Sequence, residues 1–114
     1  MKVDSFEELI VWQNSRKTAV LIYKLFDQTR DYGFRDQILR ASVSIMNNIA
    51  EGFERKTNNE FKQFLFIAKG SCGELRSMLY LARDTDKISE AEFKTLYNSV
   101  IEISKMLSGL IKKL

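Results

Sequence analysis

A row of cations is the feature of this sequence most able to do chemistry. Four cations follow one another at intervals of seven residues, each directly after an apolar residue: Lys62, Lys69, Arg76 and Arg83. Because seven residues are close to two helical turns, these side chains would line one edge of a helix, drifting by about 20° per repeat. At the helical rise per residue, the row would be about 31 Å long. We call these four residues the basic rail, and their spacing and charge suit several phosphates of a folded RNA.

The rail also has a purely structural explanation. Long Lys and Arg stems commonly cover the edge of a bundle core while their charges stay in water. Glu74 lies two residues from Arg76 and five from Lys69, which are not neighbouring spacings on a helix, so it can neutralise only part of the rail. A second pair at the same interval, Lys17 and Lys24, would extend the basic surface if its helix lies alongside the rail. The spacing alone does not decide between a phosphate-binding edge and a solvated flank.

Little else in the chain could act on a substrate. There is no histidine, so the commonest general base and metal ligand is missing, along with every Ser-His or Cys-His nucleophile pair. No Walker or GxGxxG phosphate loop occurs. The carboxylates of Glu51, Glu54 and Glu60 lie beside an expected turn, where acids near a helix start are ordinary structure. We therefore expect no enzymatic activity, no catalytic residue, no cofactor and no metal.

A polar group interrupts an otherwise apolar stretch before the middle of the chain: Arg40, Asn47, Asn48 and Glu51. Asn has a poor helix propensity, so two in succession require hydrogen-bonding partners. One interpretation is that these side chains bond across a helix bundle or cap a neighbouring helix. The other is that they belong to a subunit interface or a ligand contact.

Small residues gather at positions 70–73, where Gly, Ser, Cys and Gly follow one another. Glycine in a helix costs about 1 kcal/mol relative to alanine, so we expect close approach of a neighbouring helix backbone here. A ligand or metal site is the alternative, and it would need a polar-lined cavity beside this run. Two large aromatic residues, Trp12 and Phe66, are expected in the core, and exposure of either would indicate an assembly surface.

Hydrophobic periodicity and helix caps divide the chain into four amphipathic helices. Apolar residues recur at steps of three and four, and there is no proline and only five glycines, as expected for a nearly all-helical protein. Three pairs have capping-box spacing: Ser5 with Glu8, Thr57 with Glu60, and Ser89 with Glu92. Gly33 is expected to end the first helix in the left-handed conformation. The predicted helices span residues 6–29, 34–55, 58–84 and 90–113.

Short connections between these helices predict an all-α fold, an antiparallel up-down-up-down four-helix bundle in a single domain over residues 1–114. The helix at 34–55 is the central one, because apolar residues at steps of three and four fall along one of its faces: Ile38, Ala41, Ile45, Ile49 and Phe53. The last helix carries a heptad seam made of Phe93, Leu96, Val100, Ile103, Leu107, Leu110 and Leu114. The seam is wider than that of a two-stranded coiled coil, which favours a helix that meets more than one neighbour.

Charge and cysteine content bound the setting of the protein. The net charge is +3, from 18 basic and 15 acidic side chains, which is too mild to indicate nucleic acid by itself. Cys72 is the only cysteine, so an intrachain disulfide is impossible and a reducing compartment is favoured. The first residues carry acids where a signal peptide would be apolar, and no apolar run approaches the ~20 residues that span a bilayer. We expect a cytoplasmic protein with no membrane partner.

Three stretches resemble one bacterial family: FEELIVWQNSRK, QILRASVSIMNNIAEGFER and NEFKQFLFIAKGSCGELRSML. It is the four-helix-bundle family encoded by intervening sequences in 23S ribosomal RNA genes. The run that looks most distinctive of the family is Gln37, Arg40, Ala41, Ser44, Ile45 and then residues 48–52. The family's third-helix pattern is matched by Ser71, Gly73 and Glu74. The resemblance covers nearly the whole chain.

The resemblance implies a homo-oligomeric ring of bundles, typically a homopentamer, without catalytic residues. It is similar to the accessory protein of diversity-generating retroelements, a pentameric basic bundle that works with a reverse transcriptase and nucleic acid. We therefore expect an RNA-associated protein whose basic side chains contact phosphates, with sequence choice left to RNA shape. The candidate nucleic-acid contacts are Arg40, Lys62, Lys69, Arg76, Arg83, Lys17 and Lys24. The alternative is an adaptor whose ring binds a protein partner, such as a reverse transcriptase, with the rail incidental.

Overall fold

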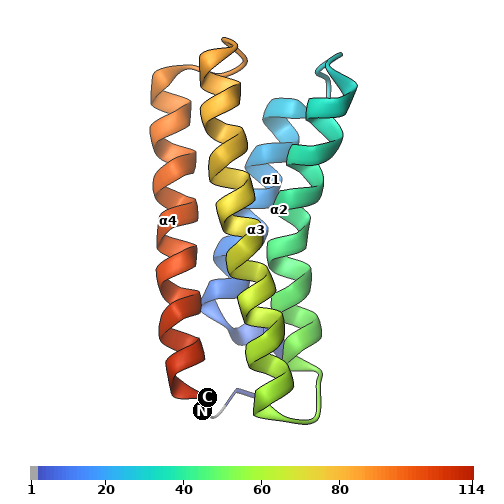
Figure 1. Ribbon diagram of the computed structural model, residues 1–114, viewed down its shortest axis with the longest axis vertical. Helices are drawn as coiled ribbons and strands as arrows, with labels where there is room; N and C mark the ends of the chain where they lie inside the picture. The colour runs from blue at the N-terminus through green and yellow to red at the C-terminus, as the bar shows by residue number, and fades with distance from the viewer. Residues whose placement is uncertain (1–2) are drawn as a thin grey trace.

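The structure, a computed structural model, describes residues 3–114 as one short turn of 3-10 helix and four long helices. These are η1 (Phe6–Glu8), α1 (Ile10–Phe26), α2 (Tyr32–Phe53), α3 (Asn58–Asp84) and α4 (Glu90–Lys113). The α1–α2 and α3–α4 connections lie at one end of the bundle and the α2–α3 connection at the other (Figure 1). Both α1 and α3 pack against α2 and α4, so α1 and α3 are diagonal to each other. The predicted all-α, up-down-up-down four-helix bundle is confirmed.

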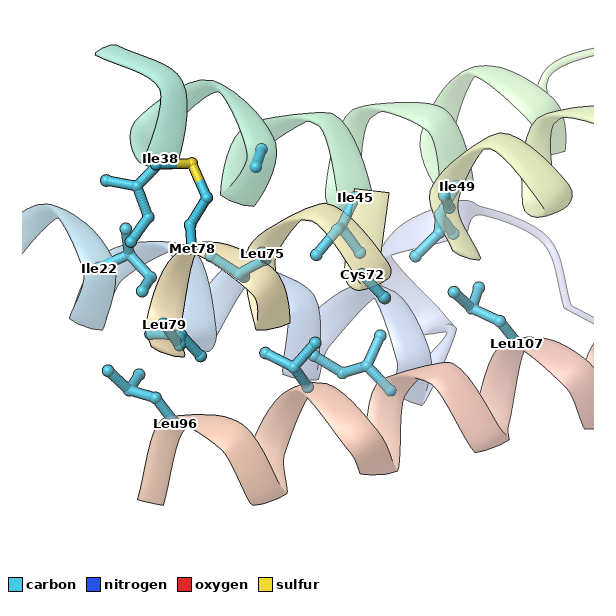
Figure 2. Close-up of a cluster of buried hydrophobic side chains, with 14 of the residues drawn as sticks. Ile22, Ile38, Ile45, Ile49, Cys72, Leu75, Met78, Leu79, Leu96 and Leu107 are labelled. Atoms are coloured by element: carbon cyan, nitrogen blue, oxygen red, sulfur yellow. The ribbon is translucent and has the colours of Figure 1, made fainter. Parts of the chain in front are cut away.

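The core runs along the bundle axis and is filled from all four helices. Ile38, Ile45 and Ile49 of α2 point into the bundle in Figure 2, where Ile38 lies beside Met78 of α3, and each is at most 1% exposed. Full burial of a side chain of this size stabilises a fold by about 1.5–3 kcal/mol. The heptad seam of α4 is buried from Phe93 to Leu110, and Leu114 at its end is half-buried. The periodicity of three and four therefore places the seam in the core, as predicted.

Side-chain caps fix the starts of the last three helices. Asp31 accepts a hydrogen bond from the Phe34 amide (3.3 Å) and begins α2. Thr57 accepts from the Glu60 amide (3.1 Å) and begins α3. Ser89 and Glu92 form a complete capping box at α4, with bonds of 3.0 and 2.8 Å. Each cap satisfies a backbone donor that the helix itself leaves free, which typically contributes about 1 kcal/mol.

The first helix differs from the prediction of residues 6–29, because it begins at Ile10 and ends at Phe26. The capping box expected at Ser5 does not form, since the Ser5 hydroxyl bonds the Glu8 carboxylate (3.3 Å) rather than a backbone amide. Leu9 is extended (φ −73°, ψ 123°) and separates η1 from α1. This break buries Leu9 and brings the Phe6 ring within 5.0 Å of Trp12.

The prediction for Gly33 is wrong. It was expected to end the first helix with a positive φ, but it lies in the first turn of α2, and no glycine within residues 3–114 has a positive φ. The physical reason is the Asp31 cap, which starts α2 at Tyr32 instead of residue 34. α2 also ends earlier than predicted, at Phe53 instead of residue 55. Among the described residues, a positive φ occurs at Asp86 (φ 58°), in the α3–α4 turn.

Close helix packing occurs at a different glycine from the two predicted. A Cβ on Gly70 would meet nothing within 4 Å, and one on Gly73 would meet only the Arg76 guanidinium at 3.9 Å. A Cβ on Gly52 of α2, in contrast, would lie 2.7 Å from the Phe64 Cβ of α3. Within the small-residue run, Ser71 is bonded to α2 through a 2.8 Å contact between its hydroxyl and that of Ser44. The prediction failed for both glycines because they lie on the flanks of α3 that face away from α2.

Candidate nucleic-acid interface

The basic rail lies on the flank of α3 that borders α4. Its side chains are half-buried, as expected for stems that run along the core edge. The contacts of Arg83 show that this flank faces α4, because its guanidinium reaches Glu90 (3.8 Å) and lies over the Phe93 ring of α4 (4.4 Å). Within residues 3–114, Lys62, Lys69 and Arg76 have no acidic side chain within 4 Å. Three of the four rail cations are therefore available to an anionic partner.

Arg83 is the exception in the rail. Its guanidinium is 3.3 Å from Asp84, 3.8 Å from Glu90, and lies over the rings of Tyr80 and Phe93. These contacts join the last turn of α3 to the first turn of α4. Two carboxylates already balance the charge of Arg83. Its role is therefore to connect α3 to α4 at this end of the bundle, and it adds little free positive charge to the rail.

Three lysines of α4 enlarge the basic surface: Lys94, Lys105 and Lys112. Lys94 follows Glu90 by four residues and precedes Tyr97 by three, so it lies on the α4 edge that borders α3. The other two recur 11 and 18 residues later, close to whole numbers of helical turns. The offset set by the Arg83–Glu90 pair brings Lys105 near the level of Lys69 and Lys112 near that of Lys62. We call the rail and these lysines together the α3–α4 basic groove.

The α4 lysines were not among the contacts predicted from the sequence. Their spacing within α4 is visible in the sequence, but spacing alone cannot say which edge of α4 borders α3. The Arg83–Glu90 and Tyr80–Phe93 contacts supply that orientation. These lysines could have been identified by looking for cations that lie at the same height along two consecutive antiparallel helices.

Aromatic side chains close the groove near the α3–α4 turn. The rings of Tyr80, Phe93 and Tyr97 form a cluster with centroids 5.1–5.5 Å apart. Phe93 is buried, whereas Tyr80 is 43% exposed. Hydrogen bonding and repulsion from the neighbouring Tyr97 hydroxyl raise the pKa of Tyr80, so its phenol is neutral at physiological pH. The exposed ring beside the rail is thus an uncharged aromatic surface.

The remaining predicted contacts do not join the rail. Lys17 and Lys24 are exposed on α1, which is diagonal to α3, so the two lysines do not extend the rail sideways. Arg40 is exposed on α2 and lines a surface groove with Asp36, Asn47 and Glu51. It lies toward the opposite flank of α3, where Ser44 meets Ser71. The structure therefore brings together only the four rail residues among the seven candidates.

Of the polar group of α2, Asn48 takes part in a chain of hydrogen bonds that reaches α3. Asn48 donates to the Ser44 carbonyl (2.8 Å) and hydroxyl (3.0 Å), and Ser44 contacts Ser71 across the α2–α3 boundary (2.8 Å). This chain of hydrogen bonds fits the interpretation of bonding across the bundle. Glu51 instead pairs with Arg55 one turn later (3.2 Å), and Asn47 is exposed.

Two apolar surfaces remain uncovered on diagonal helices. The outer face of α3 exposes Phe66 (57%), Ile67 (51%) and Leu81 (50%). The outer face of α1 exposes Val20 and Leu21, and Tyr23 is exposed at the border of α1 with α2, each by more than two-fifths. The core placement expected for Phe66 is therefore wrong, whereas Trp12 is buried as expected. Groups of exposed large apolar side chains are typical of protein contact sites.

Metal and membrane functions receive no support from the geometry. Across residues 3–114 no cluster of three His, Cys, Asp or Glu side chains is placed to hold a metal ion. Cys72 is fully buried in the core (Figure 2), and this burial raises the pKa of its thiol to about 11 despite the nearby charges of Arg76 and Lys69. None of the described helices combines the length and apolar character that a membrane crossing requires.

The fold and this surface define a small all-α bundle protein with a row of cations along the border of α3 and α4. The family model described as 23S rRNA-intervening sequence protein matches residues 7–109, and the chain belongs to this family. It is similar to a solved structure from Bacteroides thetaiotaomicron, described as a protein of unknown function from the S23 ribosomal protein family. The two chains are 30% identical and superpose with a TM-score of 0.84 over 90% of this chain and 99% of the other. No match was found among curated proteins. The family predicted from the sequence is confirmed.

Proposed function

We propose that this protein is a non-enzymatic, oligomeric RNA-associated protein whose α3–α4 basic groove contacts the phosphate backbone. The α3–α4 basic groove is the observation that carries the proposal. Lys62, Lys69 and Arg76 lack acidic partners within the described residues, and exposed lysines of α4 lie at matching levels across the groove. The free part of the rail, from Lys62 to Arg76, is about 21 Å long at the helical rise, which fits several phosphates, with selection left to RNA shape.

Oligomerisation is supported by the two uncovered apolar surfaces. They lie on α1 and α3, which are diagonal, so they face different directions on one subunit. Contact between two different faces of identical subunits is heterologous, and such contacts generate rings when the rotation closes. A homopentamer is the ring size that the family resemblance implies. The basic groove lies on the α4 side of α3 and would recur once in every subunit.

A second function, an adaptor for a protein partner such as a reverse transcriptase, is favoured by the same apolar surfaces. Phe66 and Ile67 are adjacent and exposed on the outer face of α3, which suits contact with another protein if the ring leaves them free. In that case the basic groove is incidental, and RNA binding is weak and disappears as salt rises.

The first test is fluorescence anisotropy with a structured ribosomal RNA fragment and a scrambled control, at several salt concentrations. We expect binding that persists near physiological salt and prefers the structured fragment. The double variant K69E/R76E should bind more weakly, with a log–log salt slope shallower by about 1.5–2, because two phosphate contacts are lost.

A matched control for this test is the double variant K17E/K24E. It makes the same change in net charge, but on α1 and away from the groove. Its salt slope should stay close to that of the unmodified protein. Equal loss of slope in both double variants would mean generic attraction to a basic protein and would favour the adaptor function.

A further inference from the structure

Tyr80 lies among the cations of the α3–α4 basic groove. It follows Arg76 by four residues and precedes Arg83 by three, so both are its neighbours along the α3 flank. The register of the two helices brings Lys94 of α4 to its level on the other side of the groove. The ring is 43% exposed, although Phe93 beside it is only 6% exposed. An aromatic surface is therefore presented to solvent between positive charges on both sides.

The contacts of Tyr80 hold its ring in one place. The Phe93 centroid is 5.1 Å away and the Tyr97 centroid 5.5 Å away, the latter in an edge-to-face arrangement. The Arg83 guanidinium lies over the ring, 5.2 Å from its centroid. Arg83 is itself fixed by Asp84 and Glu90, so the support does not depend on any ligand. A ring that is already ordered loses little conformational entropy when another planar group stacks on it.

We propose that Tyr80 is a stacking platform for an unpaired RNA base, with the flanking phosphates held by Arg76 and Lys94. The inference deepens the proposed function and rests on it. Every nucleobase has a planar face, so stacking on an aromatic ring tolerates any sequence but requires a base that is not already stacked in a duplex. The groove would therefore favour structured RNA that carries a bulge or loop over a continuous duplex.

Phe66 shows why the proposal names Tyr80 alone. It stands between Lys62 and Lys69 just as Tyr80 stands between Arg76 and Arg83. It is, however, continuous with Ile67 on the outer apolar face of α3, which suits a protein contact. Tyr80 instead turns toward α4, as its contacts with Phe93 and Tyr97 demonstrate.

The test compares two RNA hairpins of identical stem sequence, both closed by the same compact tetraloop whose bases stack on one another. The paired hairpin has a continuous stem, and the bulged hairpin carries a single bulged 2-aminopurine in its stem. Binding is measured by anisotropy, and stacking is measured by quenching of 2-aminopurine fluorescence. We expect the unmodified protein to bind the bulged hairpin about tenfold more tightly and to quench its fluorescence. Tyr80→Leu should remove both the preference and the quenching, while its binding to the paired hairpin and its salt slope stay unchanged.

Two further variants separate stacking from other effects of the substitution. Tyr80→Phe keeps the ring and should retain the preference. Tyr32→Leu removes another exposed tyrosine, which also carries an arginine over its ring (Arg35, 4.8 Å) but belongs to α2. It should behave like the unmodified protein. Circular dichroism confirms that each variant is folded.

The outcomes distinguish this inference from the function on which it rests. Loss of preference in Tyr80→Leu alone supports the stacking platform. If the unmodified protein binds both hairpins equally, with the same salt slope, or if Tyr80→Leu keeps the preference, the platform is wrong and RNA association stands. If neither hairpin binds near physiological salt, the proposed function itself fails and the platform falls with it.

Discussion

Cys72 is the side chain whose ionisation the fold controls most strongly. Burial raises its pKa from 9.0 to about 11, with Arg76 and Lys69 opposing the shift. The folded protein keeps the thiol protonated where the unfolded chain ionises it. Its contribution to stability is therefore complete below pH 9 and is lost as the pH rises from 9 to about 11.

We expect this loss to appear in urea unfolding measured at pH 8 and pH 10.5. Between these conditions the unmodified protein should lose about 2 kcal/mol more of its free energy of unfolding than Cys72→Ala does. The alanine variant is the control, because lysines and tyrosines that titrate in the same range are common to both proteins. An identical pH dependence in the two would mean that the buried thiol is not the group responsible.

At the scale of elements, the α2–α3 contact depends on a missing side chain. Gly52 brings α2 so near to α3 that an added Cβ would lie 2.7 Å from the Phe64 Cβ and 3.3 Å from the Phe61 carbonyl oxygen. Neither is the end of a flexible side chain, so the helices must separate to admit a methyl group. We expect Gly52→Ala to lower the free energy of unfolding by about 1–3 kcal/mol in denaturant titrations.

The matched control is Gly70→Ala in the interior of α3. Nothing lies within 4 Å of the added Cβ, and alanine has the higher helix propensity. This variant should be more stable by about 0.5–1 kcal/mol. Equal effects of the two substitutions would contradict the close approach at Gly52.

Local capping made much of the fold predictable from the sequence. Thr57 and Ser89 fix the starts of α3 and α4 through bonds to residues three positions away, and those starts agree with the prediction. Ser5 has the same pattern but forms no cap, because the burial of Leu9 and the edge-to-face packing of Phe6 against Trp12 are tertiary effects that a local pattern does not contain. The prediction for Gly33 failed for a local reason. Asp31 caps the start of α2 at Tyr32, so Gly33 lies inside α2 and does not end the first helix.

The candidate interface was predictable only in part. The rail is a property of one helix, so its interval of seven residues could be seen in the sequence. Three other features depend on which helices are neighbours. These are the contribution of the α4 lysines, the position of Arg40 on the side of α3 opposite the rail, and the separation of Lys17 from the rail. That information arises when the four helices pack together, and no single-helix spacing carries it.

At the scale of the whole molecule, the two uncovered apolar surfaces predict assembly. We expect sedimentation velocity to show a ring-sized oligomer, and Ile67→Glu on α3 or Val20→Glu on α1 to reduce it to smaller species. Each substitution alone should suffice, because every heterologous contact uses one face of each kind. Tyr32→Glu, at an exposed position on α2, should leave the oligomer intact. A monomeric unmodified protein at tens of micromolar would refute the ring.

The diagonal placement of α1 and α3 also affects how the chain is completed during synthesis. α1 needs both α2 and α4 as partners, and its contact with α4 joins residues as distant in sequence as Asn14 and Met106 (Figure 1). Since α4 is the last of the four helices to be made, one side of α1 stays uncovered until translation has passed Met106. The α3–α4 hairpin, in contrast, is joined by a short turn and can form from neighbouring residues alone. The part of the basic groove beside this turn, with Tyr80 and Lys94, can therefore take shape before α1 is fully enclosed.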